Sequence, residues 1–269
     1  MNIIYHITFN TDGPATKFFE GEGFKIKPGI INTFDITEDH PKWERVKEAV
    51  KCYGDYEVRV KEYGAKFTKK EIEEAAYFAL LAEWNFEYPQ PSEAFGYQET
   101  TYRSGIGCRK CGVGLQQYKS FSIKKKPNWG KLDILQLNWV FDEYFVSKEM
   151  KDKLEGKISG TRFLEVLKHP QSIVLDDIFQ LLVENRVSLV LPENSAFKIC
   201  DMCKCKKYMP SLLGRGFFPL PFENDFSIAQ SQEFFGDGGR AFRITIINRA
   251  TYLLLTELNI KGVNFYPCA

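Results

Sequence analysis

Two short cysteine motifs, separated by a long insertion, constrain the fold of this chain more than any other feature. The first pair is Cys108 and Cys111 and the second is Cys200 and Cys203, each with two residues between its cysteines. Such a spacer lets one tight turn direct two thiolates at one ion, and two turns supply a tetrahedral four-sulfur zinc site. Because 88 residues separate Cys111 from Cys200, the insertion must fold and return to the first motif. The sequence therefore predicts one structural Zn²⁺ bound by all four cysteines.

The cysteines allow other interpretations. Cys205 follows the second motif closely and is an alternative ligand to Cys203. The pairs are also compatible with ordinary thiols or with a redox-active pair, although neither pair begins a helix after an apolar strand, as thioredoxin-like pairs do. Four thiolates fill the coordination shell, so we expect the metal to have no catalytic role. The two isolated cysteines, Cys52 and Cys268, are expected to be buried or idle thiols.

The composition is typical of a soluble globular protein. The 269 residues are 44% hydrophobic, and 36 Lys and Arg balance 35 Asp and Glu. A net charge of +1 gives no field that would draw the chain to phosphate backbones or anionic lipids, so neither nucleic acid nor a membrane is an expected partner. The absence of a long apolar stretch and of a secretory signal, with an odd number of cysteines, predicts a cytoplasmic protein with reduced thiols.

Local patterns predict a mixed α and β fold. The stretches expected to form strands are 3–9, 56–60, 135–141 and 188–191, and those expected to form helices are 42–51, 68–84 and 175–187. The helix predicted over 68–84 starts with Thr68 and Glu71, which match a capping box. We expect an α+β protein with an N-terminal strand-helix region over 1–100 and a zinc-binding region over 101–269.

The second half of the chain contains two similar segments. They span about 141–167 and 242–267. Each runs from a predicted strand through a short helix and a glycine to another predicted strand. Ser147 and Asn248 stand where a side-chain oxygen caps the first turn of a helix, and Gly160 and Gly262 follow the helices. We therefore expect two related strand-helix-strand units that the zinc site bridges.

Other groups of reactive side chains are weaker candidates for a site. A nucleic-acid-binding surface would use Lys124, Lys125, Lys126, Lys206 and Lys207. An enzyme would assemble its site from acidic residues such as Asp142, Glu143 and Asp177. No nucleophile, histidine or glycine-rich loop accompanies the pair at 142–143, so we expect the protein not to be an enzyme. The turn at 236–239 lacks the strand and helix of a phosphate-binding loop, and no histidine lies in a catalytic-looking neighbourhood.

The cysteine motifs and the repeated segment resemble those of the bacterial double-CxxCG motif proteins. The residues that carry the resemblance are Cys108 to Gly112, Cys200 to Cys203, and Ser147, Leu154, Gly160 and Phe163. The resemblance covers about the last two-thirds of the chain and implies zinc binding. The second motif departs from the family pattern, because Lys204 stands in place of glycine and Cys205 is added. The fourth ligand therefore stays open between Cys203 and Cys205.

From these patterns we expect a non-enzymatic, zinc-stabilised module with a protein partner. The repeated strand-helix-strand ending also resembles segments of immunity proteins that neutralise toxins delivered between bacteria. This resemblance implies an immunity protein or antitoxin that occludes a toxin. The alternative is a zinc-containing nucleic-acid-binding or regulatory protein in which the lysines named above contact phosphates.

Overall fold

The chain folds into two compact units. The computed structural model describes residues 1–209, 215–223, 225–236 and 240–269. The N-terminal unit is Met1–Glu74 with Ser211–Phe217, and the C-terminal unit is Ala75–Pro210 with Phe218–Ala269. Both units contain helices and strands, so the mixed α+β class predicted from the sequence is confirmed. The chain leaves the N-terminal unit after Glu74, rather than near residue 100, because 77–86 supplies strands to the sheets of the C-terminal unit.

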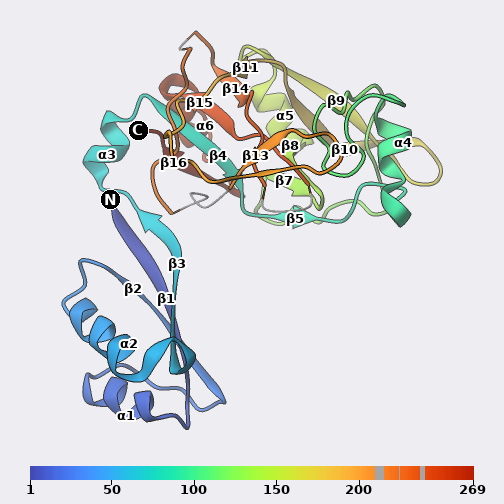
Figure 1. Cartoon of the computed structure of the whole chain (residues 1–269). Helices are drawn as coiled ribbons and strands as arrows, with labels where there is room; N and C mark the ends of the chain where they lie inside the picture. Colours follow the sequence, from blue (N-terminus) through green and yellow to red (C-terminus); the bar gives the residue numbers. More distant parts are fainter. Residues whose placement is uncertain (210–214, 224, 237–239) are drawn as a thin grey trace. The chain divides into compact units, whose positions relative to one another are not determined.

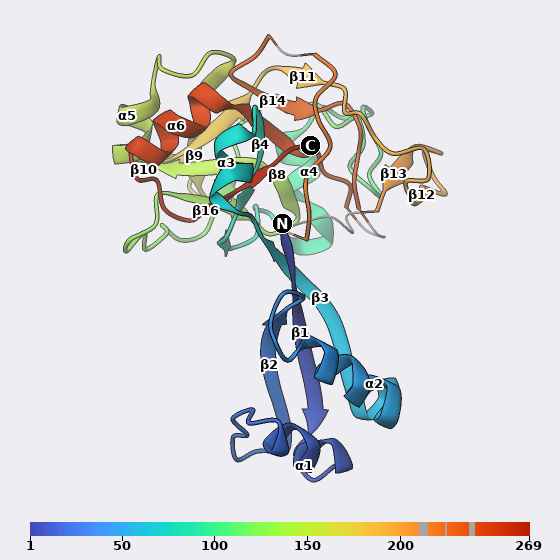
Figure 2. The same ribbon diagram turned by 90° about the vertical axis from the view of Figure 1, so that its left-hand side faces the viewer.

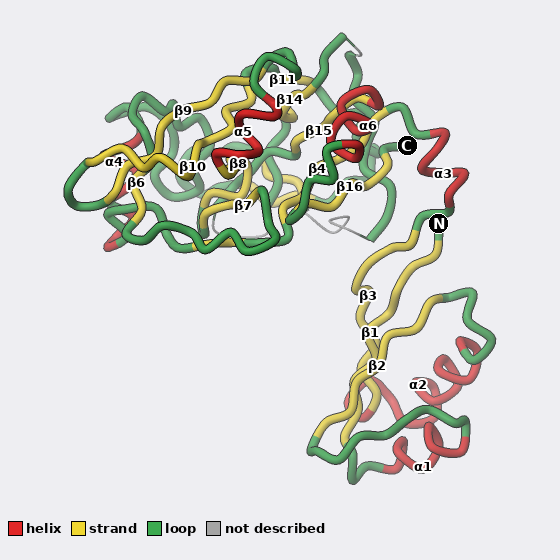
Figure 3. Tube along the Cα trace, turned by 180° about the vertical axis from the view of Figure 1, so that it is seen from behind, coloured by secondary structure: helices red, strands yellow, loops and turns green. Residues whose placement is uncertain are grey.

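A three-stranded antiparallel sheet and two helices form the core of the N-terminal unit. Its elements in chain order are β1 (Asn2–Asn10), α1 (Pro14–Gly21), β2 (Ile31–Thr37), α2 (Trp43–Glu57), β3 (Val58–Lys66) and α3 (Lys69–Glu74). Strand β1 lies between β2 and β3, and both long helices cover one face of the sheet (Figure 3). Alternation along β1 directs Ile7 and Phe9 into this core, where Phe9 contacts Phe19 of α1.

Two larger sheets and a small ribbon form the C-terminal unit (Figure 1). The six-stranded sheet has the order β5 (Asn85–Phe86), β7 (Ile134–Leu137), β8 (Val140–Ser147), β10 (Ile173–Val183), β9 (Thr161–Lys168) and β6 (Ser122–Ile123). The five-stranded sheet has the order β11 (Arg186–Val187), β14 (Ile228–Ser231), β15 (Thr245–Asn248), β4 (Tyr77–Ala82) and β16 (Val263–Pro267). The ribbon pairs β12 (Phe197–Ile199) with β13 (Lys206–Tyr208), and Figure 2 shows it at the periphery of this unit.

Short helices connect these strands. They are a 3₁₀ turn at Glu93–Phe95, α4 (Tyr97–Thr101), α5 (Lys148–Leu154) and α6 (Arg249–Glu257). Among the described residues, no helix is both long and apolar enough to cross a membrane.

The two repeated segments have the element order expected from the sequence. The first consists of β8, α5 and β9, and the second consists of β15, α6 and β16. Ser147 Oγ accepts a hydrogen bond from Met150 N, and Asn248 Oδ1 accepts one from Thr251 N, so both residues cap their helices. The glycine after each helix has a positive φ, of 79° at Gly160 and 90° at Gly262.

Several of the secondary-structure predictions are wrong in whole or in part, and the strand predicted over 188–191 is only an isolated bridge at Leu189. The helix predicted over 68–84 starts with the expected capping box but ends at Glu74, and 77–82 forms β4. The helix predicted over 175–187 is replaced by the long strand β10, and the strand predicted over 135–141 turns between β7 and β8. Because β4 is paired on both sides and largely buried, its apolar run has no alternation that separates strand from helix.

Candidate metal centre

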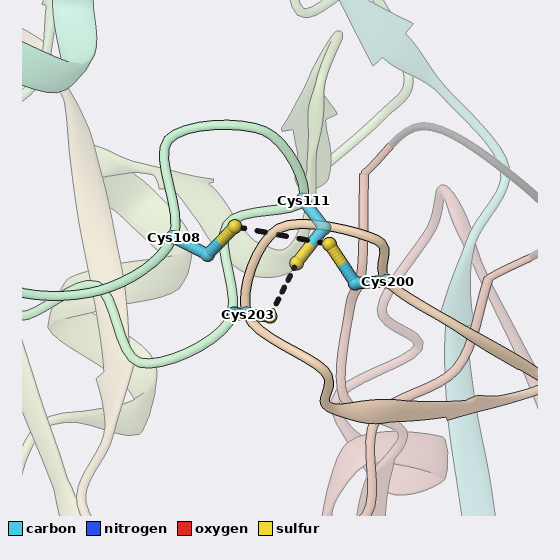
Figure 4. Close-up of side chains that lie close together, drawn as sticks. All are labelled: Cys108, Cys111, Cys200 and Cys203. Carbon is cyan, nitrogen blue, oxygen red and sulfur yellow. Dashed lines mark hydrogen bonds between the residues drawn. The ribbon is translucent and has the colours of Figure 1, made fainter.

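Two loops of the C-terminal unit bring four cysteine sulfurs together. Figure 4 shows the side chains of Cys108 and Cys111 on one loop and those of Cys200 and Cys203 on the other, directed toward one another. The four Sγ atoms all lie within 4.8 Å of one another. The insertion between the motifs therefore folds back as the sequence requires, and the four cysteines form a cluster that can hold a metal ion.

The distances between the sulfurs fit a tetrahedral zinc site. Sγ of Cys108 lies 3.9 Å from that of Cys200, and Sγ of Cys111 lies 3.6 Å from that of Cys203. Sulfurs placed about 2.3 Å from one Zn²⁺ at tetrahedral angles are roughly 3.8 Å apart. A disulfide would require about 2.05 Å, and all seven cysteines are free thiols. The arrangement thus matches metal ligation and leaves the thiols reduced.

The two loops have the same backbone hydrogen bonds. In the first, Cys108 N donates to Val113 O at 2.8 Å and Gly112 N donates to Cys108 O at 2.7 Å. In the second, Cys200 N donates to Cys205 O at 3.0 Å and Lys204 N donates to Cys200 O at 2.9 Å. These bonds close each two-residue spacer into a tight turn. The resemblance between the motifs therefore extends from cysteine spacing to backbone conformation.

Burial and backbone hydrogen-bond donors shift the pKa values of two of the cysteine thiols. Cys108, Cys111 and Cys200 are buried, and Phe234 and Ala241 pack against the cluster. Burial raises the pKa of the Cys111 thiol. The backbone N–H groups of Cys203 and Met202 donate to the sulfur of Cys200 and lower its pKa to about 6. Such donors stabilise thiolate, which is the form that binds a metal.

Lys204 occupies the position that corresponds to Gly112. Gly112 has φ 84° and Lys204 has φ 63°, so both residues are in the left-handed region after the second cysteine of their loop. The double-CxxCG pattern that the motifs resemble has glycine at this place. In this chain Lys204 adopts the same left-handed conformation as Gly112. A side chain in this region is strained because its Cβ approaches the neighbouring carbonyl oxygen.

We expect Lys204→Gly to stabilise the protein by about 1–2 kcal/mol, because glycine adopts the left-handed conformation without strain. Urea unfolding of the zinc-loaded protein measures this gain. Lys204→Ala is the matched control, since it removes the same charge and keeps the Cβ. An equal gain in both variants would show that charge, rather than backbone conformation, determines the effect.

The other cysteines lie outside the four-sulfur group. Cys205 is half-buried beside the cluster, and its backbone takes the place that Val113 has in the first loop. Cys52 is exposed on α2 in the N-terminal unit. Cys268 is buried, and burial raises its pKa to about 12. Of the two alternatives for the fourth ligand, the structure brings Cys203 into the group and leaves Cys205 out.

Four of the five lysines considered for phosphate contact are paired, packed over a ring or buried, and the fifth, Lys125, is exposed. Nζ of Lys126 lies 2.5 Å from Asp176 Oδ1, and Nζ of Lys124 lies 3.8 Å from a carboxylate oxygen of Glu93. Lys206 Nζ lies over the Phe197 ring, and Lys207 is buried. These residues do not form one unpaired basic surface. In the turn at 236–239, residues 237–239 lie outside the described part of the chain.

Two of the three acidic residues singled out from the sequence line a cleft. Asp142 and Glu143, on β8, are half-buried in its wall, whereas Asp177 on β10 is paired with Lys126 away from it. We call this hollow of about 860 Å³ the β8 cleft, and its walls include Tyr102, Asp142, Glu143, Arg186 and Arg243. The sequence suggested two of its three carboxylates, Asp142 and Glu143, but not its arginines, because these come from distant segments that carry no motif.

Burial, and then the negative charge of Asp142, raises the pKa of Glu143 to about 8. The folded protein therefore retains a proton that the unfolded chain releases, so its stability falls as pH rises from about 4.5 to 8. Glu143→Gln removes this ionisation. We expect the variant to lose less stability than the wild type between pH 5 and pH 9, by about 1 kcal/mol or more. Urea unfolding at both pH values measures the difference, and identical pH dependence in the two proteins would contradict this account.

No family model matches the chain, and no curated protein matches its sequence. The resemblance to the double-CxxCG motif proteins therefore depends on the cysteine motifs and the repeated segment. The structure supports the metal-binding part of this resemblance, because it places the four sulfurs within 4.8 Å of one another.

Proposed function

We propose that this chain is a non-enzymatic, zinc-stabilised protein-binding module of the cytoplasm. The observation that carries the zinc assignment is the cluster of four sulfurs at separations suited to one tetrahedral ion. With four thiolates bound, Zn²⁺ has no open position for water, and its role is to hold the two loops together. Reduced thiols, which such a site requires, are maintained in the cytoplasm.

Exposed apolar side chains on and beside the second cysteine loop support binding to a protein partner. Phe197 and Ile199 on β12 and Met202 in the loop are exposed, with 46%, 59% and 63% of their surface accessible. We call these three side chains the knuckle face. Exposed aromatic and Met side chains are enriched at protein interfaces. A zinc ion in the adjoining loop would fix their backbone before a partner binds, which lowers the entropic cost of association.

The more specific form of the proposal is an immunity protein or antitoxin that occludes a toxin. Its support is the resemblance of the cysteine motifs and the strand-helix-strand segments to the double-CxxCG group and to immunity proteins. The alternative nucleic-acid-binding function has weaker support, because Lys124 and Lys126 are paired with carboxylates.

Affinity capture from extracts of the source organism tests the proposal. The zinc-loaded wild type should retain a protein whose expression arrests growth, and coexpression of the wild type should restore growth. Phe197→Ser combined with Ile199→Ser should abolish both effects, because it removes the apolar contacts of the knuckle face while altering only exposed side chains. Tyr56→Ser, at an exposed position of α2, is the control and should behave like the wild type. Capture of nucleic acid in place of a protein, or unchanged capture by the double variant, would contradict the proposal.

A further inference from the structure

The β8 cleft has the size and the lining of a small-molecule site. Its volume of about 860 Å³ lies within the range of ligand pockets, which is about 300–1,000 Å³. Aromatic rings of Tyr97, Tyr102 and Trp139 form part of its wall, and charged side chains form another part. Pockets that combine apolar walls with a few polar groups usually hold ligands that have both kinds of surface.

Two arginines of the cleft lack carboxylate partners. Among the described residues, neither Arg186 nor Arg243 forms an ion pair within 4.0 Å. Nε of Arg243 is buried without a hydrogen-bond partner, and its guanidinium lies 4.1 Å from the centre of the Phe234 ring. A buried donor without a partner destabilises the fold, and a bound acceptor would supply the missing hydrogen bond.

The two guanidinium groups also act on each other. Burial lowers the pKa of Arg243, and the positive charge of Arg186 lowers it further. Arg186 is oriented by hydrogen bonds from Nη1 to the carbonyl oxygens of Val183 and Asn185, at 2.9 and 3.1 Å. The two like charges repel each other, and an oxyanion between them would relieve this repulsion.

Two carboxylates of the cleft, those of Asp142 and Glu143, accept hydrogen bonds, and the third, Glu165, is exposed on β9. Asp142 Oδ2 accepts a hydrogen bond from the backbone N of Arg243 at 3.2 Å, and Glu143 Oε2 accepts one from Gln180 Nε2 at 2.9 Å. Gln180 is held in turn by Gln117 at 2.8 Å. The raised pKa of Glu143 leaves this side chain largely uncharged at neutral pH. The arginine side chains therefore dominate the charge around this part of the cleft.

We propose that the β8 cleft binds a small oxyanion ligand, with its phosphate or carboxylate group on Arg186 and Arg243 and a planar ring against the aromatic wall. A guanidinium presents paired N–H groups that match either oxyanion, so both ligand chemistries fit. The ring would contact Tyr102 and Trp139, whose flat faces bind planar groups with little loss of side-chain entropy. This proposal concerns a site separate from the knuckle face and does not depend on the protein partner.

One wall of the cleft adjoins the metal centre. Ala241 N donates to Cys111 O at 2.6 Å, and both Ala241 and Gly112 line the cleft. The guanidinium of Arg243 lies over the ring of Phe234, and Phe234 packs against the cysteine cluster. Metal bound to the four sulfurs would therefore hold the backbone that positions Arg243.

Calorimetric titration of the zinc-loaded full chain with phenyl phosphate, benzoate and phenol tests the proposal. At about 150 mM salt, at least one of the two anions should bind saturably with a Kd below about 5 mM. Phenol should bind at least tenfold more weakly than that anion. If phenyl phosphate binds with the lower Kd, the cleft prefers phosphate, and if benzoate does, the cleft prefers carboxylate. Arg243→Gln and Arg186→Gln should each weaken that anion about tenfold or more, because each removes a charge-assisted hydrogen bond.

A control variant and the melting temperatures distinguish loss of binding from loss of folding. Arg59→Gln, on β3 of the N-terminal unit, removes the same charge outside the cleft and should leave the affinity unchanged. Arg186 is exposed, so its substitution should preserve the melting temperature even where Arg243→Gln does not. The absence of saturable anion binding would overturn the proposal. Equal affinity for phenol, or an Arg186→Gln affinity equal to that of Arg59→Gln, would do the same.

Discussion

Cys108→Ser and Cys203→Ser are each expected to remove the bound metal and to lower the melting temperature by about 10 °C or more. Each substitution removes one of four thiolates, and the three that remain would leave the ion with an open position. A metal that binds only the folded chain adds about 4 kcal/mol when its free concentration is a thousand times the Kd. Losing this term accounts for a shift of that size in a protein of this length. Metal analysis of the purified variants and thermal unfolding measure both effects.

Cys52→Ser and Cys205→Ser are the controls. Cys52 is exposed in the N-terminal unit, and Cys205 lies beside the cluster without belonging to it. Both variants should retain the wild-type metal content, and Cys52→Ser should retain the wild-type melting temperature. Loss of metal in Cys205→Ser with retention in Cys203→Ser would reverse the choice between these two ligands. Equal metal content in Cys108→Ser, Cys203→Ser and Cys52→Ser would contradict the site.

Gly262→Ala is expected to destabilise the protein by about 3 kcal/mol. Gly262 lies between α6 and β16 of the second repeated segment with φ 90°, a conformation that costs a residue with a side chain about 1–2 kcal/mol. A Cβ at this position would also lie 2.6 Å from the carbonyl oxygen of Ile134 on β7, and this backbone atom cannot rotate away. Overpacking of this kind adds about 1–3 kcal/mol. Urea unfolding measures the total.

Gly156→Ala separates the two contributions. Gly156 has a similar φ of 75°, but a Cβ there would have no neighbour within 4 Å. We expect this variant to lose only the conformational part, about 1–2 kcal/mol. If both alanine variants were equally stable, the close approach of Gly262 to β7 would have no energetic role.

The sequence predicted those features that follow from local chemistry. The spacing within each motif gives a turn that presents two thiols, and Ser147 and Asn248 cap helices where a side-chain oxygen can reach the first turn. The convergence of the two motifs was also predictable, because a four-sulfur site needs both pairs. Positive φ at Lys204 could not be predicted from residue type, since it follows from closure of the turn.

The features that the sequence did not predict depend on partners distant along the chain. Strand β4 pairs with β15 and β16 from the far end of the sequence, and this pairing overrides a pattern that resembles a helix. The residues of the β8 cleft are also brought together from distant parts of the chain. Glu143 and Arg243 are 100 positions apart, and neither belongs to a motif, so their approach requires the folded sheets.

The most direct test of the central claim is metal analysis and X-ray absorption spectroscopy of the reduced, full-length protein. The account predicts one Zn²⁺ per chain, with four sulfur neighbours at about 2.3 Å. A stoichiometry near zero after purification without chelators, or a zinc shell with nitrogen or oxygen in place of any of the four sulfurs, would contradict it.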